Sequence, residues 1–226
     1  MSLTELQDAK VANEVEAAYS FRSQNPISEG LRQRIAAALG YKPADFNGAA
    51  AIANIGEGCG NPLLIANLRA GEFVVDLGSG GGFDCFLAGE QVGPTGKVVG
   101  FDMTRNMIDL ARKNAAKIGL TNVEFTHTDI NKLPLPDNSV DCVMSNCVLN
   151  LIVDDEKLQV VREIHRILKP CGRLAVSDFL ALKPLPLHIK NDPALRSGCI
   201  SGAVEVSQMQ KFLFDIGFDG MSPYTP

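Results

Sequence analysis

The stretch Phe73-Val-Val-Asp-Leu-Gly-Ser-Gly-Gly-Gly-Phe-Asp84 decides the fold of this 226-residue chain. An apolar, β-branched run from Phe73 to Leu77 breaks into four glycines within five residues, and a helix-compatible segment begins near Gly82. Glycines let the backbone turn sharply and come close to a ligand, because no Cβ stands in the way. The stretch therefore predicts a strand, a ligand-binding loop and a helix.

The spacing of these glycines argues against a nicotinamide dinucleotide. Such a loop needs a third glycine three residues after the second, and Phe83 stands at that position. The form D-x-G-x-G-x-G instead resembles the first motif of class I S-adenosylmethionine (SAM)-dependent methyltransferases. The resemblance implies SAM as the cofactor, with a binding loop made of Asp76, Gly78, Ser79, Gly80 and Gly82.

Strands and helices alternate on the C-terminal side of this loop. Patterning predicts further strands at 97–102, 122–127, 140–145 and 173–177, and helices at 82–91, after Thr104, from Asp154 and at about 206–216. Short buried strands that alternate with helices predict a mostly parallel sheet covered on both faces. The expected fold class is α/β, a Rossmann-like class I methyltransferase sheet that binds ligands at the carboxyl ends of its strands.

The two ends of the chain extend this core. Two helices, one over Leu3 to Tyr19 and one capped by Ser28 and closed by Gly40, predict an N-terminal helical extension over residues 1–50. The methyltransferase domain is then 51–226. After the last predicted helix only 217–226 remain, so we expect C-terminal strands to be missing, through truncation or a differently finished edge.

Composition narrows the classes of partner. The net charge is −5 and basic residues do not cluster, which argues against nucleic acid as a partner. No apolar run reaches membrane-spanning length, and the N-terminus does not resemble a signal peptide. Six irregularly spaced cysteines without such a signal predict reduced thiols in a cytoplasmic protein. A small-molecule substrate is expected, and the oligomeric state stays open.

Polar residues after the other strands complete a candidate cofactor site. Asp102 ends the second strand, where a carboxylate can accept hydrogen bonds from both ribose hydroxyls, and Met103 follows it. A turn or capping aspartate is the alternative, although Thr104 is the better cap. Asp129 and Ile130 are assigned to the adenine, with a plain loop aspartate as the alternative. Asn146 follows the fourth strand, where the methionine part of SAM should lie.

Thiols stand where acid–base groups are scarce. None of His127, His165 and His188 has a catalytic spacing, so an acceptor with its own lone pair fits better than one that must lose a proton. Three cysteines lie in loops that can converge above the strand ends: Cys59, Cys147 and Cys199. Simple packing is the alternative for them and is the interpretation that suits Cys85 and Cys142, and Cys171 lies in a predicted turn.

The motifs around these thiols resemble the arsenite methyltransferases. They are Gly58-Cys-Gly-Asn-Pro62, Asp76-Leu-Gly-Ser-Gly-Gly-Gly-Phe-Asp-Cys85, Ser145-Asn-Cys-Val148 with Asn150-Leu151, and Gly198-Cys-Ile-Ser-Gly-Ala203. The resemblance implies that Cys59, Cys147 and Cys199 bind trivalent arsenic as catalytic thiolates, with a thiol reductant such as glutathione or thioredoxin as co-substrate. The chain departs from the family before Gly40-Tyr41, where members usually carry another cysteine, a departure that bears on the thiol relay.

Methyl transfer from SAM to trivalent arsenic is therefore the leading hypothesis, with arsenite or methylarsenite as acceptor. The alternatives are a C- or O-methyltransferase of the quinone-biosynthesis type and a catalytically silent protein that binds SAM or a metalloid. In the folded chain, we expect Cys147 and Cys199 to lie close enough for one arsenic atom or a disulfide to join them, with Cys59 on a more mobile loop.

Overall fold

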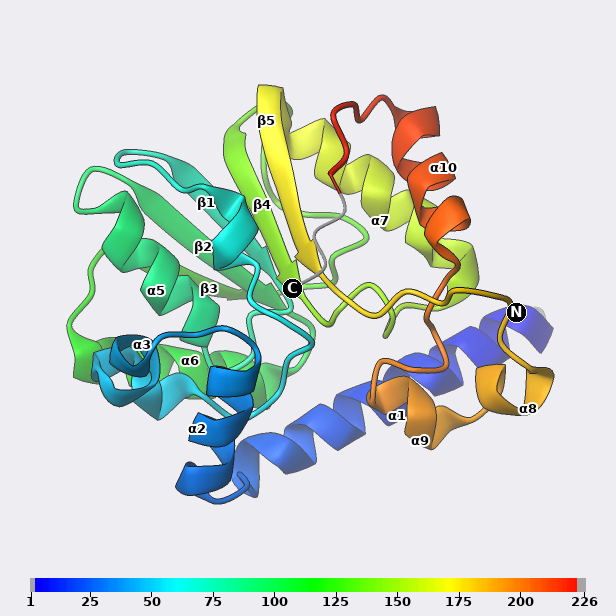
Figure 1. The fold of residues 1–226 in the computed structure, drawn as a ribbon, viewed down its shortest axis with the longest axis horizontal. Helices are drawn as coiled ribbons and strands as arrows, with labels where there is room; N and C mark the ends of the chain where they lie inside the picture. The colour runs from blue at the N-terminus through cyan, green and yellow to red at the C-terminus, as the bar shows by residue number, and fades with distance from the viewer. Residues whose placement is uncertain (1–2, 223–226) are drawn as a thin grey trace.

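A parallel β-sheet forms the centre of the molecule. The computed structural model describes residues 3–222, and within them the sheet has the order β3-β2-β1-β4-β5 with every strand pair parallel. The strands are β1 (Phe73–Leu77), β2 (Lys97–Asp102), β3 (Val123–His127), β4 (Val140–Asn146) and β5 (Leu168–Ser177). The predicted α/β class is confirmed, and the carboxyl ends of all five strands meet at one edge (Figure 1).

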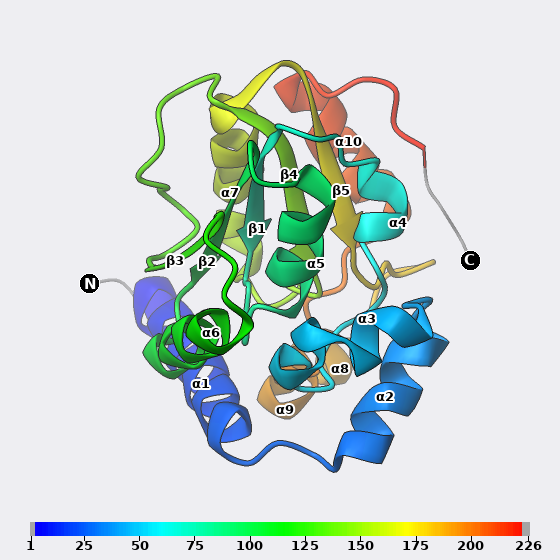
Figure 2. The same cartoon turned by 90° about the vertical axis from the view of Figure 1, so that its left-hand side faces the viewer.

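Helices cover both faces of this sheet because its strands are apolar on both sides. On one face α5 (Phe83–Val92) and α6 (Arg105–Ile118) bury Phe86 and Ile108 against it, and on the other α7 (Asp154–Ile167) and α10 (Val206–Ile216) bury Ile164 and Met209. Figure 2 shows α5 in front of the sheet and α7 behind it. The glycine loop and the other strand ends stay uncovered by these four helices.

The N-terminal helices lie over the strand ends. Helix α1 (Leu3–Gln24) crosses the molecule beneath the sheet in Figure 1, in contact with α6 and with α9 (Pro193–Ser197). The shorter elements are α2 (Glu29–Ala38), α3 (Pro43–Asn47), the 3-10 helix η1 (Ala49–Ala53), α4 (Leu63–Ala66) and α8 (Leu187–Lys190). The domain boundary at residue 50 stays a prediction.

Three local predictions need correction. Helix α1 ends at Gln24 rather than Tyr19, so it carries Arg22 as well. Strand β5 begins at Leu168 rather than Arg173, because Leu168 already pairs with Val140 before an irregular register that resumes at Cys142 and Arg173. Ser28 and Thr104 occupy N-cap positions, but neither side chain makes a capping hydrogen bond.

Within residues 3–222, each helix is too short or too polar to span a lipid bilayer.

Candidate functional site

The glycine loop turns as its sequence predicts. Gly78 has φ +67° and Gly82 has φ +94°, a left-handed backbone that costs glycine little and other residues more. A Cβ on Gly78 would overlap the Val148 side chain, so that position also has no room for a larger residue. The backbone N–H groups of Gly78 and Ser79 donate to the Phe101 carbonyl at 2.7 and 3.0 Å, which holds the loop against the end of β2.

A cavity opens above this loop, at the carboxyl ends of β1, β2 and β4. Most of the predicted cofactor residues line it: Asp76, Gly78, Ser79, Gly80, Met103, Asp102, Ile130 and Asn146. The Asp102 carboxylate accepts the Gly80 N–H at 2.9 Å and the Thr104 N–H at 2.8 Å. The buried Ser79 hydroxyl has no hydrogen-bond partner in the described structure and lies beside Gly100 of β2.

Two of the predicted cofactor residues lie slightly apart from this wall. Asp129 is exposed beside Ile130, and its carboxylate accepts the Asn131 N–H at 2.9 Å. Gly82 begins the turn into α5, where a Cβ would lie 2.8 Å from Phe86 and Phe125. The adenine assignment of Asp129 therefore stays a prediction. Gly82 allows the loop to turn into α5 where there is no room for a side chain.

Two buried carboxylates form the floor of the cavity. Asp76 and Asp84 are both buried, and the groups that bond them are neutral: the Cys85 thiol donates to Asp76 at 3.1 Å and the Tyr41 hydroxyl to Asp84 at 2.6 Å. Burial, with the neighbouring Asp84 carboxylate, raises the pKa of Asp76 well above its usual value. Burial also raises the pKa of Asp84, although Tyr41 and Asn146 oppose it. A cationic ligand group beside these two carboxylates would offset the free-energy cost of burying their negative charge.

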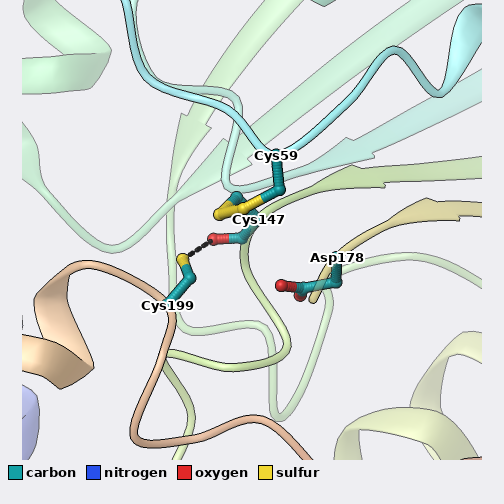
Figure 3. Close-up of side chains that lie close together, drawn as sticks. All are labelled: Cys59, Cys147, Asp178 and Cys199. Atoms are coloured by element: carbon teal, nitrogen blue, oxygen red, sulfur yellow. Dashed lines mark hydrogen bonds between the residues drawn. A yellow bond between two sulfur atoms is a disulfide. The ribbon is translucent and has the colours of Figure 1, made fainter. Parts of the chain in front are cut away.

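Next to the cavity, three thiol-bearing loops converge. The sulfur atoms of Cys59, Cys147 and Cys199 and a carboxylate oxygen of Asp178 all lie within 4.8 Å of one another (Figure 3). The Cys199 thiol donates to the Cys147 carbonyl at 2.9 Å. Cys147 itself lines the cavity, so the thiol cluster and the cofactor cavity share a wall.

The expected closeness of Cys147 and Cys199 is confirmed, because their sulfur atoms lie within 4.8 Å of one another. The prediction of reduced thiols is wrong for Cys59 and Cys147, which a disulfide joins across Cα atoms 5.2 Å apart. The reason is Asn146, whose side-chain oxygen accepts the Cys59 N–H at 3.0 Å and whose amide donates to the Gly60 carbonyl at 3.0 Å. The Cys59 loop is thus bonded to the end of β4 rather than held apart from it.

The backbone at two of these cysteines is unusual. Cys147 and Cys199 have φ +62° and +61°, in the left-handed region that residues with a Cβ seldom adopt. Cys171, exposed within β5 where the sequence predicted a turn, is the third cysteine with this geometry. Such strain is often found at functional sites, where surrounding contacts enforce it. Here the Cys147 N–H donates to the Ser177 carbonyl at 2.8 Å, and the Asn150 amide donates to the Cys199 carbonyl at 3.2 Å.

Electrostatics keep part of the cluster protonated near neutral pH. Burial, aided by the Asp178 carboxylate, raises the pKa of Cys199 to about 12, and the nearby Tyr19 hydroxyl opposes part of this rise. Burial raises the pKa of Asp178 to about 6, against the N–H groups of Asn150 and Phe179. Cys199 is therefore a thiol, not a thiolate, before it meets a ligand.

Sequence reasoning missed four residues of this site: Tyr19, Tyr41, Asp84 and Asp178. Asp84 follows the glycine loop and Asp178 follows β5 directly, so position at a strand or loop end was the available signal. The two tyrosines come from the N-terminal helical segment, and nothing in their sequence context indicates where they pack. Both line the cavity or its thiol side.

Comparison with known proteins agrees with this geometry. A family model described as a methyltransferase domain matches residues 68–217. An arsenite methyltransferase of Halobacterium salinarum is 46% identical over 183 residues, which are 81% of this chain and 46% of that protein. The human arsenite methyltransferase is 37% identical over 170 residues, 71% of this chain and 44% of that protein. The chain thus spans less than half the length of these relatives.

A solved structure extends the likeness to three dimensions. The crystal structure of an arsenic(III) SAM methyltransferase from Chlamydomonas reinhardtii superposes with a TM-score of 0.62 at 33% identity, covering 71% of this chain and 56% of that one. The resemblance inferred from the motifs is confirmed by these comparisons.

Proposed function

This chain belongs to the methyltransferase domain family, and from that premise we propose that it transfers a methyl group from SAM to trivalent arsenic held by Cys59, Cys147 and Cys199. One observation carries the proposal: three sulfur atoms lie within 4.8 Å of one another beside the cavity that Cys147 helps to line. Thiolates are soft ligands and suit a soft trivalent metalloid. The relatives named above support the choice of acceptor.

The cavity suits SAM in its polar groups. Asp102 keeps lone pairs free for the ribose hydroxyls, and the buried carboxylates of Asp76 and Asp84 offer a place for the ammonium group. Bound there, SAM supplies an electrophilic methyl group on a sulfonium. The glycine loop holds the backbone close to the ligand, and Asn146 links this wall to the Cys59 loop.

The thiols would load arsenic without net proton uptake or release. Each cysteine replaces one hydroxide on arsenous acid: the sulfur forms a bond to arsenic, the As–O bond breaks, and the thiol proton leaves with the hydroxide as water. Three thiols so placed replace all three oxygens of arsenous acid and leave the lone pair on arsenic free. The transfer then depends on orientation, for which pre-positioned reactants are worth several kcal/mol, up to about 10.

The disulfide supports a need for a thiol reductant. While Cys59 and Cys147 are joined, only Cys199 of the three is free, so two electrons from an external thiol must open the bond before arsenic binds. Glutathione and thioredoxin are the reductants we propose, each becoming a disulfide as the two thiols form.

A turnover assay tests the function. Reduced protein would be incubated with SAM, arsenite and glutathione, and methylated arsenic and S-adenosylhomocysteine would be measured by chromatography coupled to mass spectrometry. We expect both products to rise together. S-adenosylhomocysteine formed only with a phenolic or quinol acceptor would favour the quinone-type enzyme, and binding of both ligands without product would favour the silent binding protein.

A further inference from the structure

Helix α1 reaches both of the outer cysteine loops through one side chain. An Nη of Arg22 donates to the Ser197 carbonyl at 3.0 Å and lies 3.4 Å from a Glu57 carboxylate oxygen. Glu57 comes two residues before Cys59, and Ser197 comes two residues before Cys199. One guanidinium therefore links equivalent positions in two loops that are far apart in the sequence.

The position of Arg22 is itself constrained. Its guanidinium stacks over the ring of Tyr19, 4.7 Å from the centroid, and Tyr19 lines the cavity. The Arg22 side chain is only 28% exposed, and that of Glu57 only 35%. Both contacts come from one nitrogen, Nη1, whose two N–H groups can point to the two loops.

Each cysteine loop also has its own anchor at or just beyond the end of β4. Asn146, the last residue of β4, bonds the Cys59 loop, and Asn150, in the turn that follows β4, bonds the Cys199 carbonyl at 3.2 Å. These anchors hold each loop to the region after β4, whereas Arg22 ties the loops to one another. Loss of Arg22 should therefore leave both loops folded but loosen the spacing between Cys59 and Cys199.

We propose that Arg22 is a positioning residue that fixes the spacing of the Cys59 and Cys199 thiols and so favours arsenicals with three exchangeable ligands. This inference rests on the proposed function. Arsenous acid has three hydroxides and needs three thiols at once, whereas methylarsonous acid has two hydroxides and needs two. A looser third thiol has a lower effective concentration at the arsenic atom, so arsenite suffers more than methylarsonous acid.

The binding test uses the reduced protein. Dissociation constants for arsenite, methylarsonous acid and SAM would be measured by titration for the wild type, for Arg22→Gln and for a control, Arg34→Gln, an exposed arginine on α2. We expect Arg22→Gln to weaken arsenite binding about five- to tenfold, as for loss of a charged hydrogen bond and a partly buried ion pair. The dissociation constant for methylarsonous acid should change less than about twofold, and Arg34→Gln should bind the ligands as the wild type does.

The SAM measurement distinguishes loss of the Arg22 contacts to the two cysteine loops, which we call the clamp, from displacement of helix α1. Helix α1 also bonds α6 on the cofactor side, where the Asn106 amide donates to the Ser20 hydroxyl at 2.6 Å. If Arg22→Gln displaced the whole helix, SAM binding and both arsenicals would weaken together, and the clamp would be excluded. Equal affinities of Arg22→Gln and Arg34→Gln for arsenite would exclude it as well.

A second measurement does not depend on arsenic. In a Cys147→Ser background, the rate at which a mild oxidant joins Cys59 to Cys199 reports their spacing, and we expect Arg22→Gln to slow it several-fold relative to Arg34→Gln. Equal rates in the two variants would overturn the clamp. A wild type that binds no arsenical while Arg22→Gln still slows the oxidation would refute the proposed function and leave the clamp standing.

Discussion

At the scale of single residues, the thiol cluster requires both cysteine side chains and an unusual backbone conformation at two of them. Cys147 and Cys199 hold left-handed φ values that surrounding bonds enforce, and their side chains meet at the edge of the cavity. Serine would keep the shape but is a hard ligand that stays protonated at neutral pH. The contribution of each sulfur can therefore be measured by a nearly isosteric change.

Replacing Cys147 or Cys199 with serine should abolish binding of trivalent arsenicals and leave SAM binding within about twofold, because we propose that the glycine loop and Asp102, not the thiols, bind the cofactor. Isothermal titration with each ligand checks this. Cys142→Ser on β4 and Cys171→Ser at an exposed position of β5 serve as controls, and the former should reduce stability only. If Cys147→Ser and Cys142→Ser bind arsenicals equally well, the arsenic proposal fails.

Replacing Asp102 with alanine should weaken SAM binding by about 1–3 kcal/mol, since the ribose would lose charge-assisted hydrogen bonds. The change also removes the acceptor for Gly80 and Thr104, so the variant's thermal stability should be recorded beside its SAM titration. Asp109→Ala, an exposed aspartate on α6, is the matched control. Unchanged SAM affinity in Asp102→Ala would remove the ribose assignment.

At the scale of elements, the end of β4 holds the cofactor side and the thiol side together. The Asn146 amide donates to Asp84 at 3.0 Å and to the Gly60 carbonyl at 3.0 Å, while its oxygen accepts the Cys59 N–H. One side chain at a strand end thus sets the position of a loop that lies far away in the sequence. Loss of the Asn146 side chain should therefore disturb both the cofactor cavity and the Cys59 loop.

Replacing Asn146 with alanine should lower the free energy of unfolding by about 1–3 kcal/mol, because buried donors and acceptors lose their partner. Affinity for SAM and for arsenite should fall together. Urea denaturation and ligand titration measure these effects. Asn122→Ala is a useful comparison, since Asn122 bonds the Gly89 and Gly93 carbonyls at the opposite end of the sheet. That variant should lose stability yet bind both ligands normally; a pattern shared by the two would contradict the linking role.

At the scale of the whole molecule, several carboxylates are buried where segments meet. Asp178 follows β5 and lies against the loop after β4 and the thiol cluster, where it accepts the Asn150 amide at 2.8 Å. Burial raises its pKa from 3.8 to about 6. A carboxyl whose pKa is raised in the folded state stabilises that state fully only below the pKa of the unfolded state, and the contribution is lost as pH rises through the folded value.

The difference in unfolding free energy between the wild type and Asp178→Asn should therefore fall by roughly 2–3 kcal/mol as pH rises from about 4 to 7. Urea denaturation across this range measures it. Glu72→Gln should show the opposite sign, because the bond from Arg173 lowers the pKa of Glu72 and its contribution is lost as pH falls. A flat difference for Asp178→Asn would mean that its carboxyl is solvated like any surface acid.

The sequence by itself determined the local elements and the class of chemistry. Strands β1 and β2 have the predicted bounds, because an apolar run that ends in glycines or a polar turn leaves few other structures open. Asp102 and Asn146 were placed correctly as strand-end residues, since parallel strands present their carboxyl ends at one edge. The cysteine motifs indicated which three cysteines lie together in the thiol cluster.

Only the tertiary structure decided which groups meet. The pairing of Cys59 with Cys147, the bond of Tyr41 to Asp84 and the double contact of Arg22 each join segments that are distant in the chain. Periodicity and turn signals report neighbours along the chain. They carry no information on how α1 crosses the strand ends, because that angle depends on packing against α6 and α9 together. The spacing of the three thiols is therefore a property of the packed molecule.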